Sequence, residues 1–124
     1  MATRPQLRPH QVITNGSMAG SITSAVTIID NKTLIGYDIS WTGTSPVGVM
    51  SVEVSNTYSQ NPDGSVRDAG NWTTLTLTTP ANVTGNTGNG FIDVDITAAY
   101  AIRLVYTRTS GTGTMQAYVT AKVT

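Results

Sequence analysis

Two aspartates in the sequence FIDVDIT are spaced in a way that could support chemistry. Asp93 and Asp95 are two residues apart, so on a β-strand both carboxylates point to the same face. A carboxylate pair can act as general acid and base, or it can bind a cation. Because the aspartates alternate with Ile92, Val94 and Ile96, the pattern favours a half-buried strand whose acidic face is solvated.

A second set of oxygen ligands occurs in the sequence NPDGSVRD, which carries Asn61, Asp63, Ser65 and Asp68 around a glycine turn. This spacing is similar to part of a calcium-binding loop. It lacks the bidentate glutamate that closes such loops, so an ordinary exposed turn is the favoured interpretation. Cation binding near Asp63 and Asp68 is the alternative.

Other forms of catalysis have little support. The chain has no cysteine and one histidine, His10, which argues against thiol catalysis, zinc knuckles and a histidine-based triad. Serine and threonine are common, but no GxSxG motif accompanies them. We therefore expect a protein that is not an enzyme and that uses no cofactor or metal.

Arg103 lies in the middle of an alternating run, YAIRLVYTRT, close to Tyr106. An arginine in a strand can form a cross-strand ion pair, and we expect its partner to be Asp93 or Asp95. The alternative is a surface patch in which Arg103 and exposed tyrosines, Tyr118 among them, bind a sugar or a neighbouring subunit.

The two tryptophans, Trp41 and Trp72, both fall at the ends of expected strands. We expect them to anchor the core. A tryptophan at a strand end can also stack on a sugar or fill a pocket in a partner, so both are candidate partner-binding residues and a glycan is one candidate ligand.

The N-terminal residues form a third candidate binding element. Arg4, Arg8 and His10 lie beside Pro5 and Pro9 and have no acidic neighbours. The prolines disfavour a regular helix or a central strand here. The sequence predicts either a frayed terminus or an extended arm that becomes ordered on a neighbouring subunit.

Strands must position these residues, because alternating runs are frequent and no amphipathic helix pattern occurs. The strongest signal is at residues 100–123, where two alternating runs flank the loop SGTG and predict a β-hairpin. Side-chain alternation fixes the face of each arm. One arm presents Ile102, Leu104 and Tyr106 on one side, and the other presents Met115, Ala117, Val119, Ala121 and Val123.

About eight strands at short spacing predict an all-β antiparallel β-sandwich with jelly-roll or Ig-like topology. We assign residues 1–20 to an extended N-terminal arm and residues 21–124 to the sandwich. Gly36 inside a strand indicates a bulge or a close backbone approach. Before the hairpin, the expected strands cover residues 12–14, 21–30, 33–41, 47–55, 72–77 and 91–97, with exposed loops at 56–71 and 81–90.

Composition limits the class of partner. The chain has 124 residues, no net charge and 11% charged residues, which fits one domain with many turns. It has no basic stripe to bind nucleic acid, no apolar run long enough for a membrane span, and no signal-peptide pattern. We expect a protein that is made in the cytoplasm and binds other proteins.

Four segments in order carry a resemblance to a known class of proteins: PVGVMSVEVSN, NWTTLTL, FIDVDIT and YAIRLVYTRTSGTGTMQAYVTAKV. Together they fall within residues 46–123, and the last is the most specific. The pattern resembles small virion structural proteins of tailed bacteriophages. The resemblance implies a β-sandwich located in a virion and made in the host cytoplasm, and it transfers no catalytic residue.

Three functions remain open. The first is a capsid decoration, cement or accessory protein that binds the major capsid protein or other virion proteins in many copies and self-associates, with residues 1–20 and one sheet face bridging subunits. The second is a tail, baseplate or fibre-like component whose loops at 56–71 and 81–90 contact host glycans. The third is a carbohydrate-binding module outside any virion, which would use Trp41, Trp72 or the strand tyrosines.

Overall fold

The structure, a computed structural model, describes residues 6–29, 34–77, 81–94 and 99–122. These residues form an all-β protein, and none of them is helical. The strands in chain order are β1 (Gln6–Ser17), β2 (Ile22–Thr23), β3 (Thr27–Ile28), β4 (Leu34–Ser55), β5 (Ser59–Gln60), β6 (Val66–Asp68), β7 (Thr73–Thr74), β8 (Ala81–Val83), β9 (Thr87–Val94) and β10 (Ala101–Lys122).

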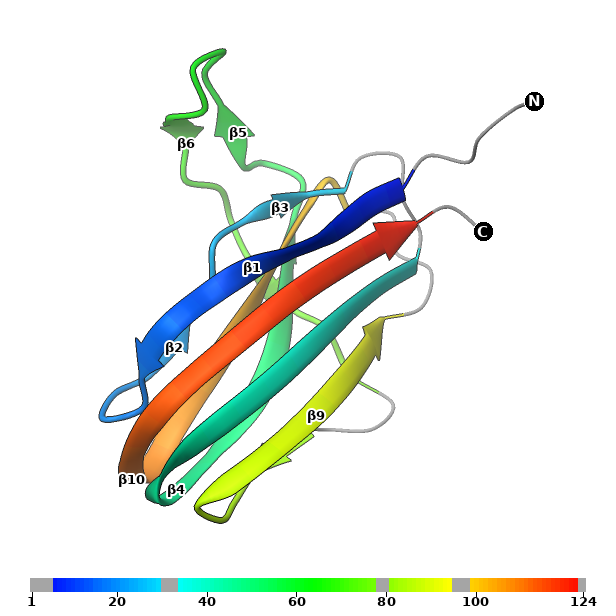
Figure 1. Ribbon diagram of the computed structural model, residues 1–124. Coiled ribbons are helices and arrows are strands. Elements are labelled where there is room, and N and C mark those ends of the chain that lie inside the picture. Colours follow the sequence, from blue (N-terminus) through cyan, green and yellow to red (C-terminus); the bar gives the residue numbers. More distant parts are fainter. Residues whose placement is uncertain (1–5, 30–33, 78–80, 95–98, 123–124) are drawn as a thin grey trace, which may run out of the picture.

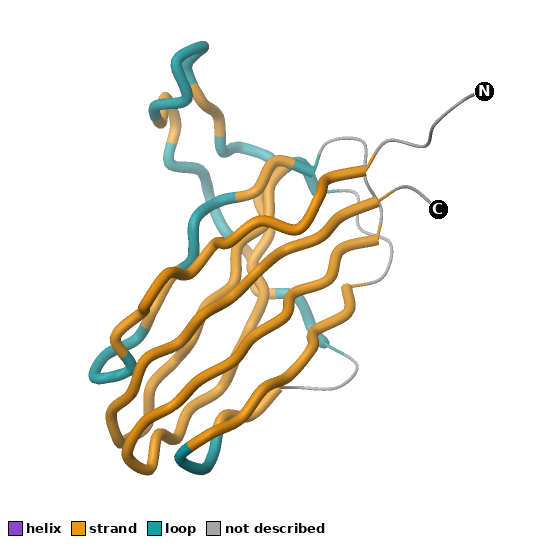
Figure 2. Tube along the Cα trace, in the orientation of Figure 1, coloured by secondary structure: helices purple, strands orange, loops and turns teal. Residues whose placement is uncertain are grey.

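Two strands of 22 residues, β4 and β10, organise the whole fold (Figure 1). They are antiparallel and pair along their full lengths, from Ala101 opposite Ser55 to Lys122 opposite Leu34. The paired ribbon folds over near its middle, where the register shifts after Arg108 (Figure 2). Each strand therefore contributes one half to each of two layers.

The two layers have the same plan. The front layer has the order β1, second half of β10, first half of β4, β9. The back layer has β2 and β3 at one edge, then the first half of β10, the second half of β4, and finally β7 and β8. The result is a two-layer antiparallel β-sandwich, so the predicted fold class is confirmed.

The predicted hairpin at residues 100–123 is wrong in its pairing. Its two runs are the two halves of β10, which lie in opposite layers, and each pairs with β4 instead of with the other. The fold-over requires Gly111, whose φ is +79° and where an added Cβ would overlap the carbonyl of Ser45. Folding the ribbon sets its apolar side against itself and removes both halves of that side from water.

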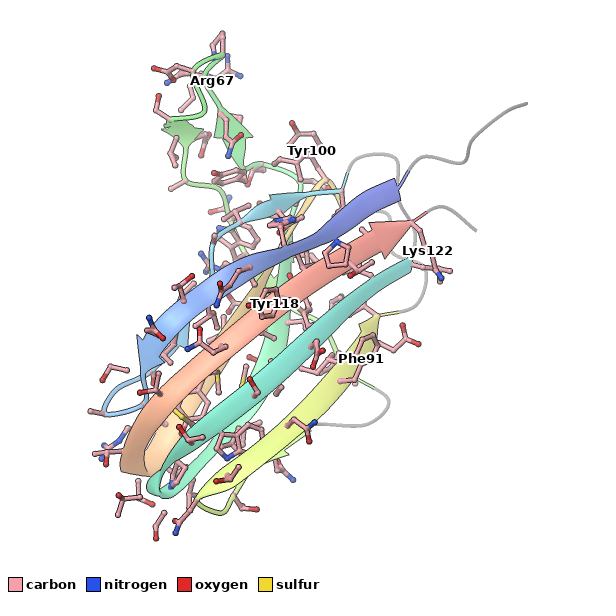
Figure 3. All side chains as sticks on the ribbon, viewed as in Figure 1. Arg67, Phe91, Tyr100, Tyr118 and Lys122 are labelled. Atoms are coloured by element: carbon pink, nitrogen blue, oxygen red, sulfur yellow. The ribbon has the colours of Figure 1, made fainter. Side chains whose placement is uncertain are left out.

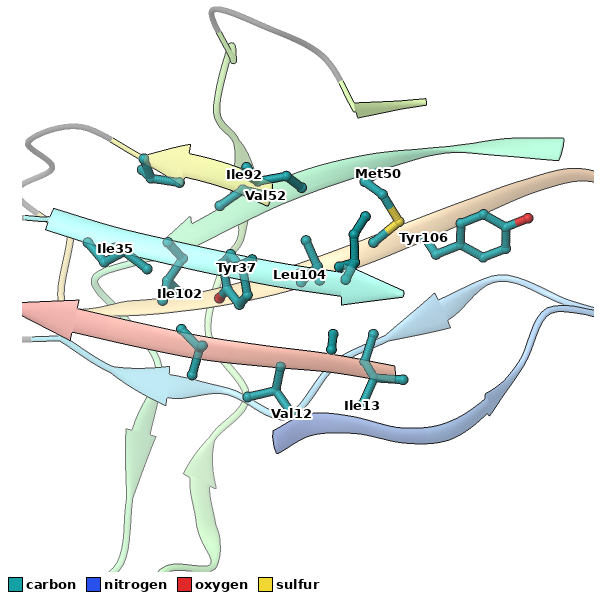
Figure 4. Close-up of a cluster of buried hydrophobic side chains, with 14 of the residues drawn as sticks. Val12, Ile13, Ile35, Tyr37, Met50, Val52, Ile92, Ile102, Leu104 and Tyr106 are labelled. Carbon is teal, nitrogen blue, oxygen red and sulfur yellow. The ribbon is translucent and has the colours of Figure 1, made fainter. Parts of the chain in front are cut away.

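The hydrophobic core lies between the layers and is lined by the inward sides of the long strands (Figure 4). The faces predicted from alternation for the two runs in residues 100–123 are buried as expected, and Val123 lies outside the described residues. The buried side chains of β4 and β10 include Ile35, Tyr37, Ile39, Trp41, Met50, Val52, Ile102, Leu104, Tyr106, Met115, Ala117, Val119 and Ala121.

One core side chain carries an unusual polar group. Tyr37 has no exposed surface, and its hydroxyl has no hydrogen-bond partner in the part of the chain that the structure describes. Burial raises the pKa of the Tyr37 phenol well above its usual value, because the phenolate would be poorly solvated there.

The polar stretch that was predicted as a loop at residues 81–90 contains strand. Residues 81–83 form β8, and β9 begins at Thr87, several residues before the run FIDVDIT. Gly88 explains this extension, because the indole of Trp41 occupies the space in which a Cβ at position 88 would lie. Glycine is the residue that lets this strand pair beside a large inward tryptophan.

The strand predicted at residues 21–30 is interrupted, so that only β2 and β3 pair with β10. Between β2 and β3, Ser24 makes the hydrogen bonds to β10. Its Oγ accepts the Leu104 amide at 2.8 Å, and its backbone amide donates to the Leu104 carbonyl at 2.8 Å. The strand predicted at 72–77 is likewise reduced to β7, although the Leu75 amide still donates to Val52.

The structure places most of the predicted arm inside the sandwich. Residues 6–17 form β1, an edge strand paired with β10, and the side chains of Val12 and Ile13 are buried. The pairing shifts register between Leu7 and His10, around Pro9, which cannot donate a ladder hydrogen bond. The expected short edge strand at 12–14 is therefore part of a longer one, and residues 1–5 lie outside the described residues.

Candidate interaction surfaces

Of the aspartate pair considered for chemistry, the structure describes only Asp93. Asp93 is exposed on the outer side of β9, as predicted, and Asp95 lies outside the described residues. In residues 6–29, 34–77, 81–94 and 99–122 there is no group of three or more histidine, cysteine, aspartate or glutamate side chains that could hold a metal ion.

The candidate calcium ligands in the β5–β6 connection serve a turn. The Asp63 carboxylate accepts hydrogen bonds from the Ser65 hydroxyl at 2.6 Å and the Ser65 amide at 3.0 Å. These two hydrogen bonds lower the pKa of the Asp63 carboxyl below its usual value. Asp68 accepts the Gly70 amide at 2.9 Å, so each carboxylate has a separate local role.

Arg103 forms a cross-strand ion pair, but with a different partner from the one predicted. It lies on the back layer directly opposite Glu53 of β4, and both its Nε and its Nη2 are 2.7 Å from Glu53 Oε1. The prediction of Asp93 or Asp95 is wrong for Arg103, because β10 pairs with β4 at this position and β9 lies in the other layer.

The patch of Arg103 with two tyrosines is also not formed. Tyr106 points into the core and donates a hydrogen bond to the Val47 carbonyl at 3.3 Å. Tyr118 lies on the front layer, where its side chain is exposed. The two tyrosines and the arginine therefore face three different environments.

The two tryptophans have different roles. Trp41 is buried in the core, as expected, and its Nε1 donates to the Gly85 carbonyl at 3.1 Å. Trp72 is half-buried on the back layer, where the Arg103 guanidinium carbon lies 4.1 Å from the ring centroid and Tyr58 packs against it in a tilted arrangement. Since Arg103 covers one face of Trp72, that face is not free to stack on a sugar.

The predicted exposed loop at residues 56–71 contains a small hairpin, β5–β6, that projects from one end of the sandwich (Figure 3). Residues 62–69 are all exposed, and Val66 at 56% is a large apolar side chain with no cover. The hairpin protrudes as a structured element, because both its turn and its base are hydrogen-bonded.

The base of the β5–β6 hairpin is held by side-chain oxygens, which accept backbone amides in place of the carbonyl oxygens of a neighbouring strand. Ser55 is buried, and its hydroxyl accepts the Thr57 amide at 3.2 Å and the Tyr58 amide at 3.1 Å. The Asn56 side chain accepts the Tyr100 amide at 2.7 Å, which ties the hairpin to the start of β10. These bonds hold the hairpin in one direction relative to the sandwich.

A second exposed apolar region lies on the outer side of the front layer, where Figure 3 shows Phe91, Tyr118 and Lys122. Phe91 is 65% exposed and Tyr118 is 44% exposed, and Asp38 of β4 lies between them, opposite both in register. The Phe91 ring lies over Gly36, where an added Cβ would overlap it, so an aromatic side chain occupies this space in place of the predicted bulge or backbone approach.

Beside the Phe91 ring is a shallow groove of about 310 Å³, which we call the front groove. Its lining is Leu34, Ile35, Gly36, Phe91, Asp93, Thr120 and Lys122. Sequence reasoning did not single out Phe91, the one phenylalanine of the chain. Side-chain alternation could have identified it, because Phe91 and Asp93 are two residues apart and therefore lie on the same, outward side of the strand.

The N-terminal candidates are only partly described. His10 lies in β1 and is exposed, Arg8 belongs to the same strand, and Arg4 lies outside the described residues. Among the predicted partner-binding residues that the structure describes, Trp72 and Arg103 are in contact, whereas Trp41 lies in the core and Tyr118 is exposed on the front layer. A search of the described residues found no helix of sufficient length and apolar character to cross a membrane.

No family model matches the chain, and no curated protein matches it. Among solved structures, its fold is similar to that of a chain in the structure of the infectious bursal disease virus Gx strain, with a TM-score of 0.53 and 10% sequence identity. That likeness covers 98% of this chain and 32% of the viral chain, so the chain spans about a third of the length of the protein it matches. At this identity the likeness shows the fold alone.

Two weaker likenesses were found. The SPBc2 prophage-derived protein YomS has a TM-score of 0.48 and 9% identity, covering 97% of this chain and 96% of that one. A chain of an infectious bursal disease virus particle has a TM-score of 0.49 and 14% identity, covering 94% of this chain and 31% of that one.

Proposed function

We propose that the chain is a structural protein of a phage particle that binds the capsid shell in many copies as a decoration or accessory protein. The observation that carries the proposal is the fold: the sandwich is similar over 98% of the chain to part of a chain from a virus. The sequence resemblance to virion proteins of tailed bacteriophages points the same way. Its partners would be the major capsid protein and further copies of itself.

The surfaces suit such a role. Large apolar side chains are exposed in separate places, at Phe91 and Tyr118 on the front layer and at Val66 on the hairpin. Polar and charged side chains lie beside them, among them Asp38 between Phe91 and Tyr118, and Arg67 next to Val66. An exposed apolar patch marks a contact surface when it is rimmed by polar groups. Many weak contacts of this kind add together when copies bind to a repeated lattice.

The direct test is electron microscopy of purified particles, with measurement of position and copy number. We expect density for the sandwich on the shell, at a copy number that matches the shell lattice. Recombinant protein added to shells that lack it should saturate at the same number. Density found only at the tail would reject the capsid assignment.

One observation favours a second candidate, a tail, baseplate or fibre-like component. The β5–β6 hairpin projects from the sandwich and exposes Val66 and Arg67, which suits contact with a host surface. Replacing both residues by serine should then reduce adsorption to host cells while incorporation into particles is unchanged. The matched control is a double serine variant of exposed residues away from the hairpin, Thr107→Ser with Thr109→Ser.

A further inference from the structure

We propose that two copies of the chain pair through the free edge of β9, antiparallel to each other and about a two-fold axis at Gly90. This contact joins the two front layers into one continuous sheet. It rests on the proposed multi-copy assembly and names the contact between copies. Figure 1 shows β9 at the outer edge of the front layer, and β4 is its only partner among the strands that the structure describes.

One hydrogen bond fixes the direction in which the β9 backbone groups point. The Gly43 amide donates to the Asn86 carbonyl at 2.7 Å, and the next pair in register is Thr42 opposite Thr87. In an antiparallel ladder, hydrogen-bonded and non-hydrogen-bonded pairs alternate. The even-numbered residues of β9 therefore bond to β4. The residues whose amides and carbonyls point to the free edge are the odd-numbered ones, Thr87, Asn89, Phe91 and Asp93.

The other side of β4 has the phase that this alternation requires. Gly43 lies opposite Gly113 of β10 in register. Because Gly43 bonds toward β9, Gly113 must direct its own backbone groups away from β4. Its carbonyl accepts the Met18 amide at 2.8 Å, on the side of β10 where β1 lies.

The side chains of β9 leave its free edge accessible. Gly88 and Gly90 have no side chain on the core side of the strand. On the outer side, the Phe91 ring leans over Gly36 of β4 and therefore away from the edge. All the edge-facing residues of β9 are exposed. A regular strand with unpaired backbone groups is a template on which another strand can form hydrogen bonds.

The other edges of the two layers are protected against such pairing. β1, the opposite edge of the front layer, contains Pro9 and shifts register at three places. Proline and bulges keep an edge strand from pairing with another chain. The edge strands of the back layer have only two or three residues each. β9 has eight residues and no proline, lysine or arginine, so it is the long unprotected edge of the described sandwich.

A second copy is the partner that suits this edge. The edge-facing residues lie symmetrically about Gly90, so a two-fold axis there places Thr87 opposite the partner's Asp93 and Asn89 opposite the partner's Phe91. Each of these pairs exchanges two backbone hydrogen bonds. The two Asp93 carboxylates lie at opposite ends of the contact, each beside a threonine hydroxyl that can donate to it. A register shifted by two residues gives fewer edge-facing residues a partner within β9.

Amide hydrogen exchange of the unmodified protein tests the contact and its phase together. The amides of Asn89, Phe91 and Asp93 should exchange more slowly in concentrated than in dilute solution, because they bond only in the dimer. The amides of Gly90 and Ile92, which bond to β4, should be protected at both concentrations and serve as the internal control. Unchanged exchange at the odd-numbered amides while sedimentation shows association would overturn the proposal, as would a chain that stays monomeric.

Disulfide trapping tests the register, since the chain has no cysteine of its own. Cysteines at positions 87 and 93 of one copy are roughly 20 Å apart along the strand, too far to link to each other. The double variant Thr87→Cys with Asp93→Cys should therefore form a covalent dimer with two disulfides, because opposed Cα atoms about 5.5 Å apart suit this bond. The matched control, Thr107→Cys with Asp93→Cys, carries one cysteine on the back layer and should link only at background level.

Two results of the trapping would overturn the proposal. A ladder of longer covalent chains would show that copies meet head to tail and not about a two-fold axis. Stronger linking of the double variant Asn89→Cys with Asp93→Cys would show a register shifted by two residues.

Charge substitution supplies a test without cysteine. Thr87→Asp places a carboxylate opposite the partner's Asp93 at both ends of the contact, so self-association measured by sedimentation should weaken about fivefold. Adding Asp93→Lys to this variant should restore association, because each lysine then faces an aspartate. The matched control is Thr107→Asp, the same charge change on the back layer, which should have no effect. Equal weakening by both aspartate variants, or no rescue by the lysine, would refute the pairing.

These outcomes are independent of the test of the proposed function. Particle microscopy reports where the protein is located, whereas exchange, trapping and sedimentation report how free copies associate. A protein found on the shell whose cysteine variants do not link would refute only the β9 contact. Linked copies of a protein that is found elsewhere would refute only the capsid assignment.

Discussion

Replacing Gly111 by alanine should destabilise the protein strongly, because this residue lies where the β4–β10 ribbon folds over. Two costs add at this position. An alanine with positive φ costs roughly 1–2 kcal/mol in backbone strain. In addition, the new Cβ would overlap the carbonyl of Ser45, which belongs to the paired strand and cannot move without disturbing it.

Gly64 supplies a matched control. Its φ is +90°, similar to the +79° of Gly111, but the space around its missing Cβ is open. Gly64→Ala should therefore cost only the backbone strain, about 1–2 kcal/mol. Gly111→Ala should lose at least about 3 kcal/mol, since overpacking costs typically a further 1–3 kcal/mol. That loss is a large fraction of the 5–15 kcal/mol by which domains of this kind are usually stable.

Urea unfolding followed by tryptophan fluorescence measures both variants, because Trp41 is buried near the fold-over. The two free energies of unfolding should differ by at least about 1 kcal/mol, with the slope in urea unchanged. If Gly111→Ala proves as stable as Gly64→Ala, the fold-over does not depend on close approach at this glycine, and the account of how two layers form is refuted.

Three further predictions concern the core and the back layer. Leu104→Ala should cost about 3 kcal/mol, because the side chain is fully buried between the layers, and calorimetry measures this loss. Tyr37→Phe should leave stability near neutral pH unchanged within about 0.5 kcal/mol, because it removes a buried hydroxyl without a partner. The raised pKa of Tyr37 keeps its contribution constant below the ordinary phenol pKa of roughly 10 and removes it as the pH rises further. The phenylalanine variant should therefore unfold at a higher pH in an alkaline titration, and an unchanged midpoint would contradict the assignment. Arg103→Ala should cost about 1–2 kcal/mol, through a partly exposed ion pair and the contact with Trp72, whereas Glu53→Gln should cost less than about 1 kcal/mol in the same urea assay.

The sequence was informative about which side of each strand is buried. Ile102, Leu104 and Tyr106 were assigned to one face from alternation alone, and all three are buried. This works because the side-chain period of two is a property of the strand itself and does not depend on the partner strand. For the same reason Phe91, which is in phase with Asp93, was accessible to prediction as an exposed residue.

Which strands pair with each other could not be predicted from alternation. The runs on either side of SGTG have identical patterns whether they pair with each other or lie in opposite layers, and only the conformation of Gly111 and the presence of β4 decide between these arrangements. The predicted ion-pair partner of Arg103 was wrong because it depended on strand pairing. Glu53 is 50 residues away in sequence, and only the β4–β10 register places it opposite the arginine.

Glycine-rich segments were another source of error. The sequence around Gly88 is polar and rich in glycine, yet it forms regular strand, where the Trp41 indole occupies the place of the side chain that Gly88 lacks. That information lies in a residue 47 positions earlier, so a local pattern could not contain it. For a related reason the predicted strands were longer than the observed β2, β3 and β7. Side-chain hydrogen bonds such as that of Ser24 take the place of backbone hydrogen bonds between strands.

The continuity of β4 and β10 through both layers has a mechanical consequence. In a sandwich of separate sheets, tension across the thin direction is resisted only by the contact between side chains. Here each central strand passes from one layer to the other, so covalent bonds share that tension at the fold-over end.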